Sequence, residues 1–444
     1  MTTNDLPKVT FFDFLKQSRS ILKNPLPFHK YNFGRFGDIF KVELGFRRAC
    51  IFTRNENLIK HILQASSKYY YKSPLQTHDL GKYIGNGLLT SNGDYWRQQR
   101  RLIQPAFYKQ ALGNIQSIMI DTILDNINDF KTGQLQDVFP VFNNLTFDVV
   151  GRSLFSYHDP KTILRLQQIT QEIQHNLIKE IRQAYKKPLF YLNGHLRRTK
   201  ALAKESRDIL KEIINKRKES TDSQTNDLLY MLLASKYEDG SSMTMEQLID
   251  EILILFVAGH ETTSNALSFV LLLLGQHPEF QDRIYEEVKD LDPKQLDMRA
   301  YFEGCPFTKQ CIDEAMRLYP PAYFFDRIAI EEDTFDSYTF KKGTIILMSI
   351  YEVHRKADLW ENPETYNPDR FTSIPKKQLS EQFFPFGAGP RMCVGSNFAY
   401  YEMLVTLAEI IKKFKLKAEK KTIAIQPLIT LKPNDALVYF ERRV

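Results

Sequence analysis

The chain has 444 residues, of which 43% are hydrophobic and 25% are charged, and its formal net charge is +7 at pH 7. This is an ordinary soluble composition with enough apolar residues for a large core. Four cysteines make no disulfide framework and indicate a reducing compartment, for which we expect the cytoplasm. No block of arginines interleaved with aromatic residues suggests a nucleic-acid partner.

The N-terminal segment, residues 1–20, carries charges among its apolar residues, so we expect neither a signal peptide nor a membrane anchor. These charges are Asp5, Lys8, Asp13, Lys16 and Arg19. No linker rich in proline, glycine or serine divides the chain. We therefore predict one domain over residues 1–444, with residues 1–30 as an N-terminal extension.

The spacing of apolar residues predicts the secondary structure. Alternation over residues 40–44, a turn at Gly45 and the apolar run 49–52 predict a hairpin. Residues 72–90, with three glycines and mixed polarity, are predicted to form a long loop. Helices are expected over residues 55–64, 94–101, 114–129, 143–156, 162–183 and 197–217, a polar connection over 219–226, and strands over 423–443.

One of these helices carries Trp96 and Arg100, which share a face because they are four residues apart. An exposed charged helix is the alternative interpretation of this pair.

The longest helical pattern starts with a capping box, Thr244 to Gln247, and runs to about residue 276. Its apolar run contains His260, Glu261 and several hydroxyl residues, which favours a buried helix over a membrane span. The central sequence, residues 258–263, reads AGHETT. A glycine there costs about 1 kcal/mol relative to alanine, and threonines can bend a helix. Such a departure from good helix sequence suggests a function, although a polar notch satisfied by neighbouring helices is the alternative.

Two further patterns contain charged residues that can form buried ion pairs. Glu314 and Arg317 lie three residues apart on one predicted helix face, and residues 368–371 read PDRF, with Arg370 in third place. Alone, neither pattern indicates a function.

A glycine-rich segment near the C-terminus, residues 386–395, presents a single cysteine, Cys393. Its glycines permit tight turns, and the following helix start favours a thiolate. Arg391 adds positive charge, and Phe386 can shield the sulfur. Zinc would need further ligands at suitable spacing, and a nucleophile would need a paired histidine. A buried structural cysteine remains the alternative on this segment alone.

Together these motifs resemble those of the cytochrome P-450 superfamily, in its soluble, bacterial type. The segment 386–395 meets every fixed position of the haem-loop pattern F-x-x-G-x-R-x-C-x-G. Residues 258–263 resemble the pattern A-G-x-[DE]-T-[TS]. Residues 314–317 and 368–371 resemble the E-x-x-R and P-E-R-F motifs, with Asp369 where glutamate is usual.

The resemblance implies a mostly α fold with a small β-region near the N-terminus, and haem b between the long central helix and the Cys393 loop. It implies that Cys393 is the axial iron ligand, that Glu261 and Thr262 deliver protons, and that Glu314, Arg317 and Arg370 form a buried charge network. His260 is expected to be a packing residue rather than an iron ligand. Residues expected to contact the cofactor are Trp96, Arg100, Arg327, Phe386, Arg391 and Cys393.

The implied activity is that of a monooxygenase, an oxidoreductase that hydroxylates or O-dealkylates a small organic substrate with dioxygen and NAD(P)H-derived electrons. A peroxide-driven haem-thiolate peroxygenase and a non-enzymatic haem sensor or storage protein are the alternatives. The substrate is expected to be hydrophobic, such as a fatty acid or terpenoid, with a methoxylated aromatic or a methylated sugar as the other possibility. Residues expected to line its pocket are Gln76, Thr77, His78, Tyr83, Ala258, Tyr323, Phe324, Leu428 and Ile429.

Electrons are expected to come from a separate ferredoxin or flavodoxin with its NAD(P)H reductase, because about fifty residues follow Cys393. We expect a monomer with a basic docking face behind the thiolate. The alternative is that these basic residues are ordinary solvated surface charges with no docking role. The residues proposed for this face are Arg97, Arg101, Lys376, Lys377, Lys412 and Lys413.

Overall fold

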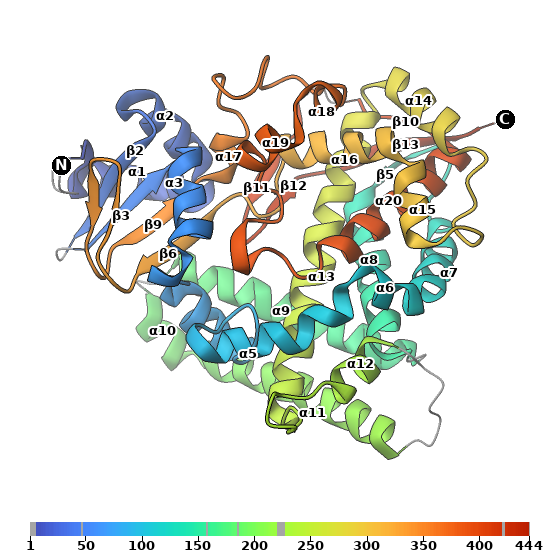
Figure 1. Ribbon diagram of the computed structural model, residues 1–444, viewed down its shortest axis with the longest axis horizontal. Coiled ribbons are helices and arrows are strands. Elements are labelled where there is room, and N and C mark those ends of the chain that lie inside the picture. The colour runs from blue at the N-terminus through green and yellow to red at the C-terminus, as the bar shows by residue number, and fades with distance from the viewer. Residues whose placement is uncertain are drawn as a thin grey trace.

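The fold has a β-rich part and a larger helical part, and the long helix α13 (Met245–Leu274) runs through the helical part (Figure 1). A computed structural model describes residues 6–45, 48–156, 159–183, 186–219, 227–419 and 422–443. The largest hydrophobic core surrounds α13, which is buried on all sides from Thr263 onward. The prediction of a mostly α fold with a small β-region near the N-terminus is confirmed.

Helices make up most of the described residues. The other α-helices are α1 (Phe11–Lys23), α2 (Leu26–Phe36), α3 (Glu56–Lys60), α4 (Gly81–Ile84), α5 (Gly93–Ile103), α6 (Lys109–Leu112), α7 (Gln116–Ile127), α8 (Val138–Phe155), α9 (Pro160–Arg182), α10 (Lys187–Leu192), α11 (His195–Glu219), α12 (Leu228–Ala234), α14 (Pro278–Val288), α15 (Met298–Gly304), α16 (Pro306–Leu318), α17 (Ile350–Val353), α18 (Arg370–Ser373), α19 (Lys376–Gln382) and α20 (Ser396–Lys413). Short π or 3₁₀ turns are η1 (His61–Ala65), η2 (Ser67–Tyr69), η3 (Leu75–Leu80), η4 (Gln104–Phe107), η5 (Gly113–Ile115) and η7 (Gly389–Arg391).

The strands of the described residues form four small sheets. A six-stranded sheet has the order β1 (Lys8–Val9), β2 (Ile39–Gly45), β3 (Arg48–Thr53), β9 (Ile345–Met348), β6 (Phe325–Ala329) and β4 (Tyr70–Tyr71). The others are β10 (Phe414–Lys417), β13 (Leu437–Arg442) and β5 (Leu135–Asp137), then β11 (Ile425–Pro427) with β12 (Leu431–Pro433), and β7 (Asp333–Phe335) with β8 (Tyr338–Phe340). The predicted hairpin is confirmed as the antiparallel pair β2 and β3, and the strands predicted near the C-terminus are β11 to β13.

The predicted start of α13 is confirmed in detail. Thr244 is its N-cap and forms a capping box with Gln247, which satisfies backbone groups that a helix start leaves without partners. The helix then continues without a break through the AGHETT sequence. There the Thr262 and Thr263 hydroxyls donate to the carbonyls four residues earlier, which satisfies them within the helix.

The prediction of a long loop over residues 72–90 is wrong for its middle part. Residues 75–84 form the π turn η3 and the short helix α4. A π turn shifts the spacing of apolar residues away from the α-helical repeat, so the pattern over these residues does not read as a helix. Most of the polar connection predicted over 219–226 lies outside the described residues, and Glu219 itself ends α11.

Within the described part of the chain, no helix has both the length and the apolar character needed to cross a membrane.

Candidate active site

A cavity of about 340 Å³ separates the middle of α13 from the segment that carries Cys393. Most of its wall is apolar and comes from elements that are far apart in the sequence. Side chains of this wall include Leu88, Leu89, Phe107, Val150, Leu255 and Phe325. A cavity of this size and character is typical of a small-molecule or cofactor site.

Cys393 faces this cavity from the end of a rigid turn. Its amide donates a hydrogen bond of 2.9 Å to the carbonyl of Phe386, which closes the turn. Gly389 has a φ of +69°, and a Cβ there would come within 1.9 Å of the Leu63 carbonyl oxygen. Glycine is therefore required at this position, because both the conformation and the close contact exclude a side chain.

Opposing effects act on the pKa of the Cys393 thiol. Burial of the group raises its pKa, whereas the Gly395 amide and the Arg100 guanidinium lower it. The exposed surface of Cys393 faces the cavity. Protein surrounds the residue on its other sides, and this burial is what raises the pKa of the thiol. The net effect is a pKa above the ordinary value of a thiol, so a thiolate here would need a further positive charge, such as that of a bound metal ion.

Four cations line the cavity, and three of them repel one another. Burial lowers the pKa of Lys72 well below its usual value and that of Arg327 to about 10, and Arg327 and Arg391 further lower the pKa of Lys72. The fourth, Arg100, donates to the Met392 carbonyl at 2.8 Å and lies beside Cys393. Lys72 was not predicted, because a single lysine after three tyrosines has no sequence signal of its own.

Arg391 and Trp96 connect the cysteine segment to α5. The Arg391 guanidinium lies 4.1 Å from the centre of the Trp96 ring and donates to the Ser91 carbonyl and the Asn92 side chain. This stacking holds the cation at the cavity wall.

The AGHETT sequence divides between the cavity and the interior. Thr262 faces the cavity and donates to the Ala258 carbonyl at 2.8 Å, and Ala258, Gly259 and Thr263 also line the wall. His260 turns away: its ring packs against Phe147, and burial lowers its pKa to about 4. It is a packing residue in this structure.

Glu261 is not among the residues that line the cavity. Its two carboxylate oxygens accept hydrogen bonds of 2.9 Å from Gln174 on α9 and from Thr430 beside β12. Burial raises its pKa, and these hydrogen bonds together with the nearby Lys432 partly offset that effect. In this conformation Glu261 joins α13 to two neighbouring elements.

The three predicted network residues lie together. Arg317 forms a bidentate pair with Glu314 at 2.7 and 2.8 Å, and Arg370 donates to the same carboxylate at 2.9 Å. Arg317 also donates to the backbone carbonyls of His354 and Pro363. Asp369, the departure from the motif, pairs instead with Arg283 on the surface.

Of the predicted pocket residues, Gln76 and Ala258 lie on the cavity wall and the others do not. Tyr83 is buried and donates to Glu180, while Tyr323 is buried and donates to the Leu428 carbonyl. His78 has an exposed side chain that pairs with Asp79. Those not on the wall are Thr77, His78, Tyr83, Tyr323, Phe324, Leu428 and Ile429.

The predicted docking residues do not form one face. Arg97 and Arg101 are exposed on α5, where they pair with Asp94 and Glu238, and Lys376 and Lys377 are exposed at the start of α19. Lys412 and Lys413 end α20, whose 18 residues span roughly 25 Å from the cysteine segment. Their inclusion was wrong, because a helix of that length carries them away from Cys393.

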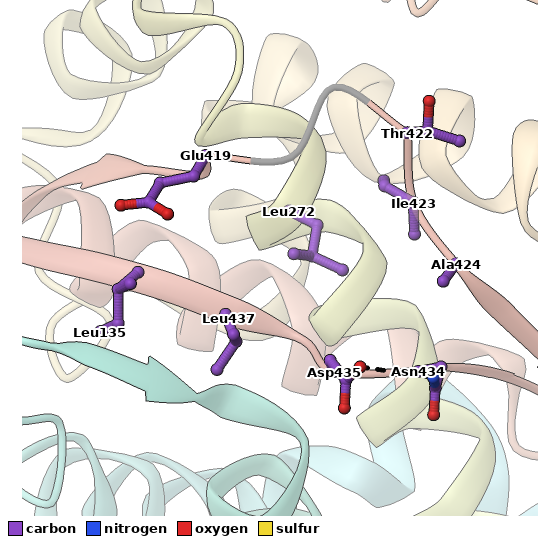
Figure 2. A pocket seen from close by; sticks show the side chains of 9 residues that line it. All are labelled: Leu135, Leu272, Glu419, Thr422, Ile423, Ala424, Asn434, Asp435 and Leu437. Atoms are coloured by element: carbon purple, nitrogen blue, oxygen red, sulfur yellow. Dashed lines mark hydrogen bonds between the residues drawn. The ribbon is translucent and has the colours of Figure 1, made fainter.

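A second pocket, of about 30 Å³, lies beside the C-terminal end of α13 and is drawn in Figure 2. Leu272, Ile423 and Leu437 are among its lining residues. A space of this volume holds one or two water molecules. It is too small for a cofactor or an organic substrate.

The larger cavity fits the haem that the sequence resemblance implies. Haem is an apolar ring with two carboxylates at one edge and a metal that takes an axial ligand. The apolar wall suits the ring, and the thiol of Cys393 supplies a soft donor. Arg327 is buried, Lys72 and Arg391 are half-buried, and the mutual repulsion of these three groups favours an anion between them.

Comparison with known proteins identifies the family. The cytochrome P450 family model matches residues 6–440. Cytochrome P450 CYP72A219 of Panax ginseng is 32% identical over 84% of this chain and 76% of its own length. Cytochrome P450 4F12 of Homo sapiens is 30% identical over 80% of this chain and 73% of its own length. The cytokinin hydroxylase of Arabidopsis thaliana is 30% identical over 87% of this chain and 77% of its own length. The chain therefore belongs to the cytochrome P450 family, and it is a haem-thiolate monooxygenase, an oxidoreductase that incorporates oxygen into its substrate.

Proposed function

We propose that Cys393 is the axial ligand of haem b in this chain. The observation that carries the proposal is the position of Cys393: it lines the cavity that Thr262 also lines, whereas Cys50, Cys305 and Cys311, which are also described, are buried elsewhere. Lys72, Arg327 and Arg391 would pair with the haem carboxylates, and Trp96 would hold Arg391 in place. Arg100 would act on the thiolate side, through the Met392 carbonyl.

A thiolate-ligated haem, when bound, activates dioxygen and favours cleavage of the O–O bond. The protein must supply protons on the side opposite Cys393. Thr262 would take this role, and its position supports the proposal: the residue lines the cavity and its hydroxyl is oriented by the Ala258 carbonyl. Glu261 would take part only if its carboxylate leaves Gln174 and Thr430, whose hydrogen bonds hold it outside the cavity wall.

The reaction proposed is hydroxylation of a hydrophobic small molecule, such as a fatty acid or terpenoid. Support comes from the cavity wall, where Leu88, Leu89, Val150 and Leu255 offer aliphatic surface and Gln76 is a polar group. Hydroxylation of a carbon next to an ether oxygen would lead to O-dealkylation, so a methoxylated aromatic or methylated sugar belongs to the same proposal.

The electron donor proposed is a separate ferredoxin or flavodoxin with its NAD(P)H reductase, in the cytoplasm. Arg97 and Arg101 on α5 support docking of an acidic partner, because both are exposed on the helix that carries Trp96 and Arg100. Their partners Asp94 and Glu238 are also exposed, and such surface pairs are weak.

Two measurements test this function. A panel of fatty acids, terpenoids and methoxylated aromatics is added to the oxidised protein, and binding is followed by the spin-state shift of the haem absorption band. Compounds that shift the band are then supplied with ferredoxin, reductase and NADPH, or with hydrogen peroxide alone. Product that requires NADPH supports the proposal. Product with peroxide alone identifies a peroxygenase. No product in either case, with neither oxygen nor peroxide consumed, contradicts an enzymatic role.

A further inference from the structure

The segment between α4 and α5, residues 85–91, is fixed to α13 by two consecutive acidic side chains. Asp250 accepts a hydrogen bond of 2.8 Å from the Asn86 amide, and Glu251 accepts one of 2.9 Å from the Leu88 amide. The backbone of the segment approaches both acidic side chains closely. A Cβ at Gly85 would lie 2.0 Å from an Asp250 oxygen, and one at Gly87 would lie 2.7 Å from a Glu251 oxygen.

Two further side chains hold the backbone of this segment. Thr90 accepts from the Gly87 amide at 3.1 Å and donates to the Gly85 carbonyl at 2.7 Å. Lys72 donates to the Leu89 carbonyl at 2.6 Å. The segment is therefore held at two kinds of backbone group, by the carboxyl groups of Asp250 and Glu251 at its amides and by Lys72 at a carbonyl.

Held in this way, the segment forms part of two functional surfaces. Leu88 and Leu89 lie on the cavity wall, next to Ile254 and Leu255 of α13. At its end, the Ser91 carbonyl accepts from Arg391. The Asp250 and Glu251 contacts thus fix how far Leu88 and Leu89 extend into the cavity.

Glu251 is buried, so it is not a solvated surface charge. Its side chain is 1% exposed, and one carboxyl oxygen lacks a hydrogen-bond partner among the described residues. Burying a carboxyl group is costly unless a specific contact offsets the cost. The contact observed is with the Leu88 amide. Asp250 differs, since Arg207 on α11 also donates to it at 2.6 Å.

We propose that Asp250 and Glu251 are positioning residues that set the substrate specificity of the cavity by fixing Leu88 and Leu89 in its wall. The proposal rests on the proposed function, because it takes the cavity to be the substrate site. It predicts that removal of either carboxylate frees residues 85–91 and weakens the binding of molecules that contact this wall. Small molecules that reach only the iron should bind as before.

The test uses the holoprotein, with Glu251→Ala and Asp250→Ala compared with Glu246→Ala. Glu246 is the matched control, because it lies on the same helix, is exposed and bonds to Arg207 rather than to the segment. Hydrogen exchange of peptides covering residues 85–91 should be about tenfold faster in the first two variants and unchanged in the control. Glu251→Gln, which keeps an oxygen acceptor for Leu88, should exchange like the wild type.

Binding is measured with two probes, imidazole and 4-phenylimidazole. The larger probe contacts the wall, so its affinity should fall at least about fivefold in Glu251→Ala, while imidazole affinity and haem content remain within about twofold. Unchanged exchange of residues 85–91, or an equal loss for both probes, overturns the proposal. A failure of both probes to shift the spectrum of the wild type contradicts the proposed function instead.

Discussion

Glu314 and Arg317, which lie one turn apart on α16, form a bidentate ion pair that solvent does not reach. Arg370 adds a second cation to the Glu314 carboxylate, and Arg317 adds hydrogen bonds to the His354 and Pro363 carbonyls. The pair therefore joins α16 to the irregular segment that precedes the cysteine. Because each charge is buried, each depends on the others.

Arg317→Ala should lower the free energy of unfolding by roughly 3–5 kcal/mol, because it leaves the Glu314 carboxylate buried with one partner fewer. Arg317→Lys should not restore it, since lysine cannot form the bidentate pair. Urea unfolding measures both effects. Arg299→Ala is the control: its partner Glu303 is exposed, so its loss should cost less than about 1 kcal/mol. Equal effects of the two alanine variants would contradict a buried network.

Thr262→Ala should separate proton delivery from substrate binding. The spin-state shift with substrate should remain, whereas product formed per NAD(P)H should fall at least about tenfold, with peroxide released instead. Thr263→Ala is the matched control, since Thr263 also lines the cavity and makes the same type of bond, to the Gly259 carbonyl. The role of Thr262 is wrong if the two variants couple NAD(P)H to product equally well.

The pH dependence of stability should report Glu251. Burial raises its pKa to about 8; the Leu88 amide and Lys72 act in the opposite direction, and Asp250 in the same one. Tyr95 also faces this carboxyl from α5. Between its ordinary pKa of 4.5 and about 8, the folded state holds a proton that the unfolded state has lost. The free energy of unfolding therefore falls as pH rises through this range, by up to about 1.4 kcal/mol per pH unit.

Glu251→Gln has no such proton and lacks this contribution. Urea unfolding of both proteins at pH 6, 7 and 8 measures the difference between them, in which the other titrating groups largely cancel. We expect the wild type to lose stability relative to the variant at each step. Parallel curves would show that Glu251 is already ionised at pH 6.

Charge reversal at Arg97 or Arg101 should slow the first electron transfer from an acidic ferredoxin. We expect a roughly tenfold decrease at low ionic strength that largely disappears in high salt, where screening removes the attraction. Haem content and the substrate-induced spin shift should not change. Lys413→Glu serves as the control, because Lys413 is exposed at the far end of α20. Reduction rates that change neither with salt concentration nor with charge reversal at Arg97 or Arg101 would exclude this docking site.

The local parts of the fold and site follow from the sequence. The capping box at Thr244, the β2–β3 hairpin and the turn that presents Cys393 depend on residues within a few positions of one another. Glu314 and Arg317 are also close in sequence, so their pairing needs only a helix. In these cases the residue types and their spacing determine the geometry directly.

The cavity wall depends on contacts between distant segments, and there the prediction was less successful. The π turn η3 places Gln76 at the cavity, while Tyr83 of the following α4 meets Glu180 of α9 instead. Lys72 gains its role only beside Arg327 and Arg391. Glu261 was expected at the cavity, but Gln174 and Thr430 hold its carboxylate elsewhere. None of these partners has a fixed spacing from the residue that it contacts.

The central claim is that Cys393 binds the haem iron as a thiolate, and its most direct test is the absorption spectrum of the reduced protein with carbon monoxide. The wild type and a Cys50→Ala control, whose cysteine is buried in β3, should both show the strongly red-shifted band of thiolate ligation. Cys393→His should retain haem and lose that band. A Cys393→His spectrum identical to that of the wild type would contradict the assignment.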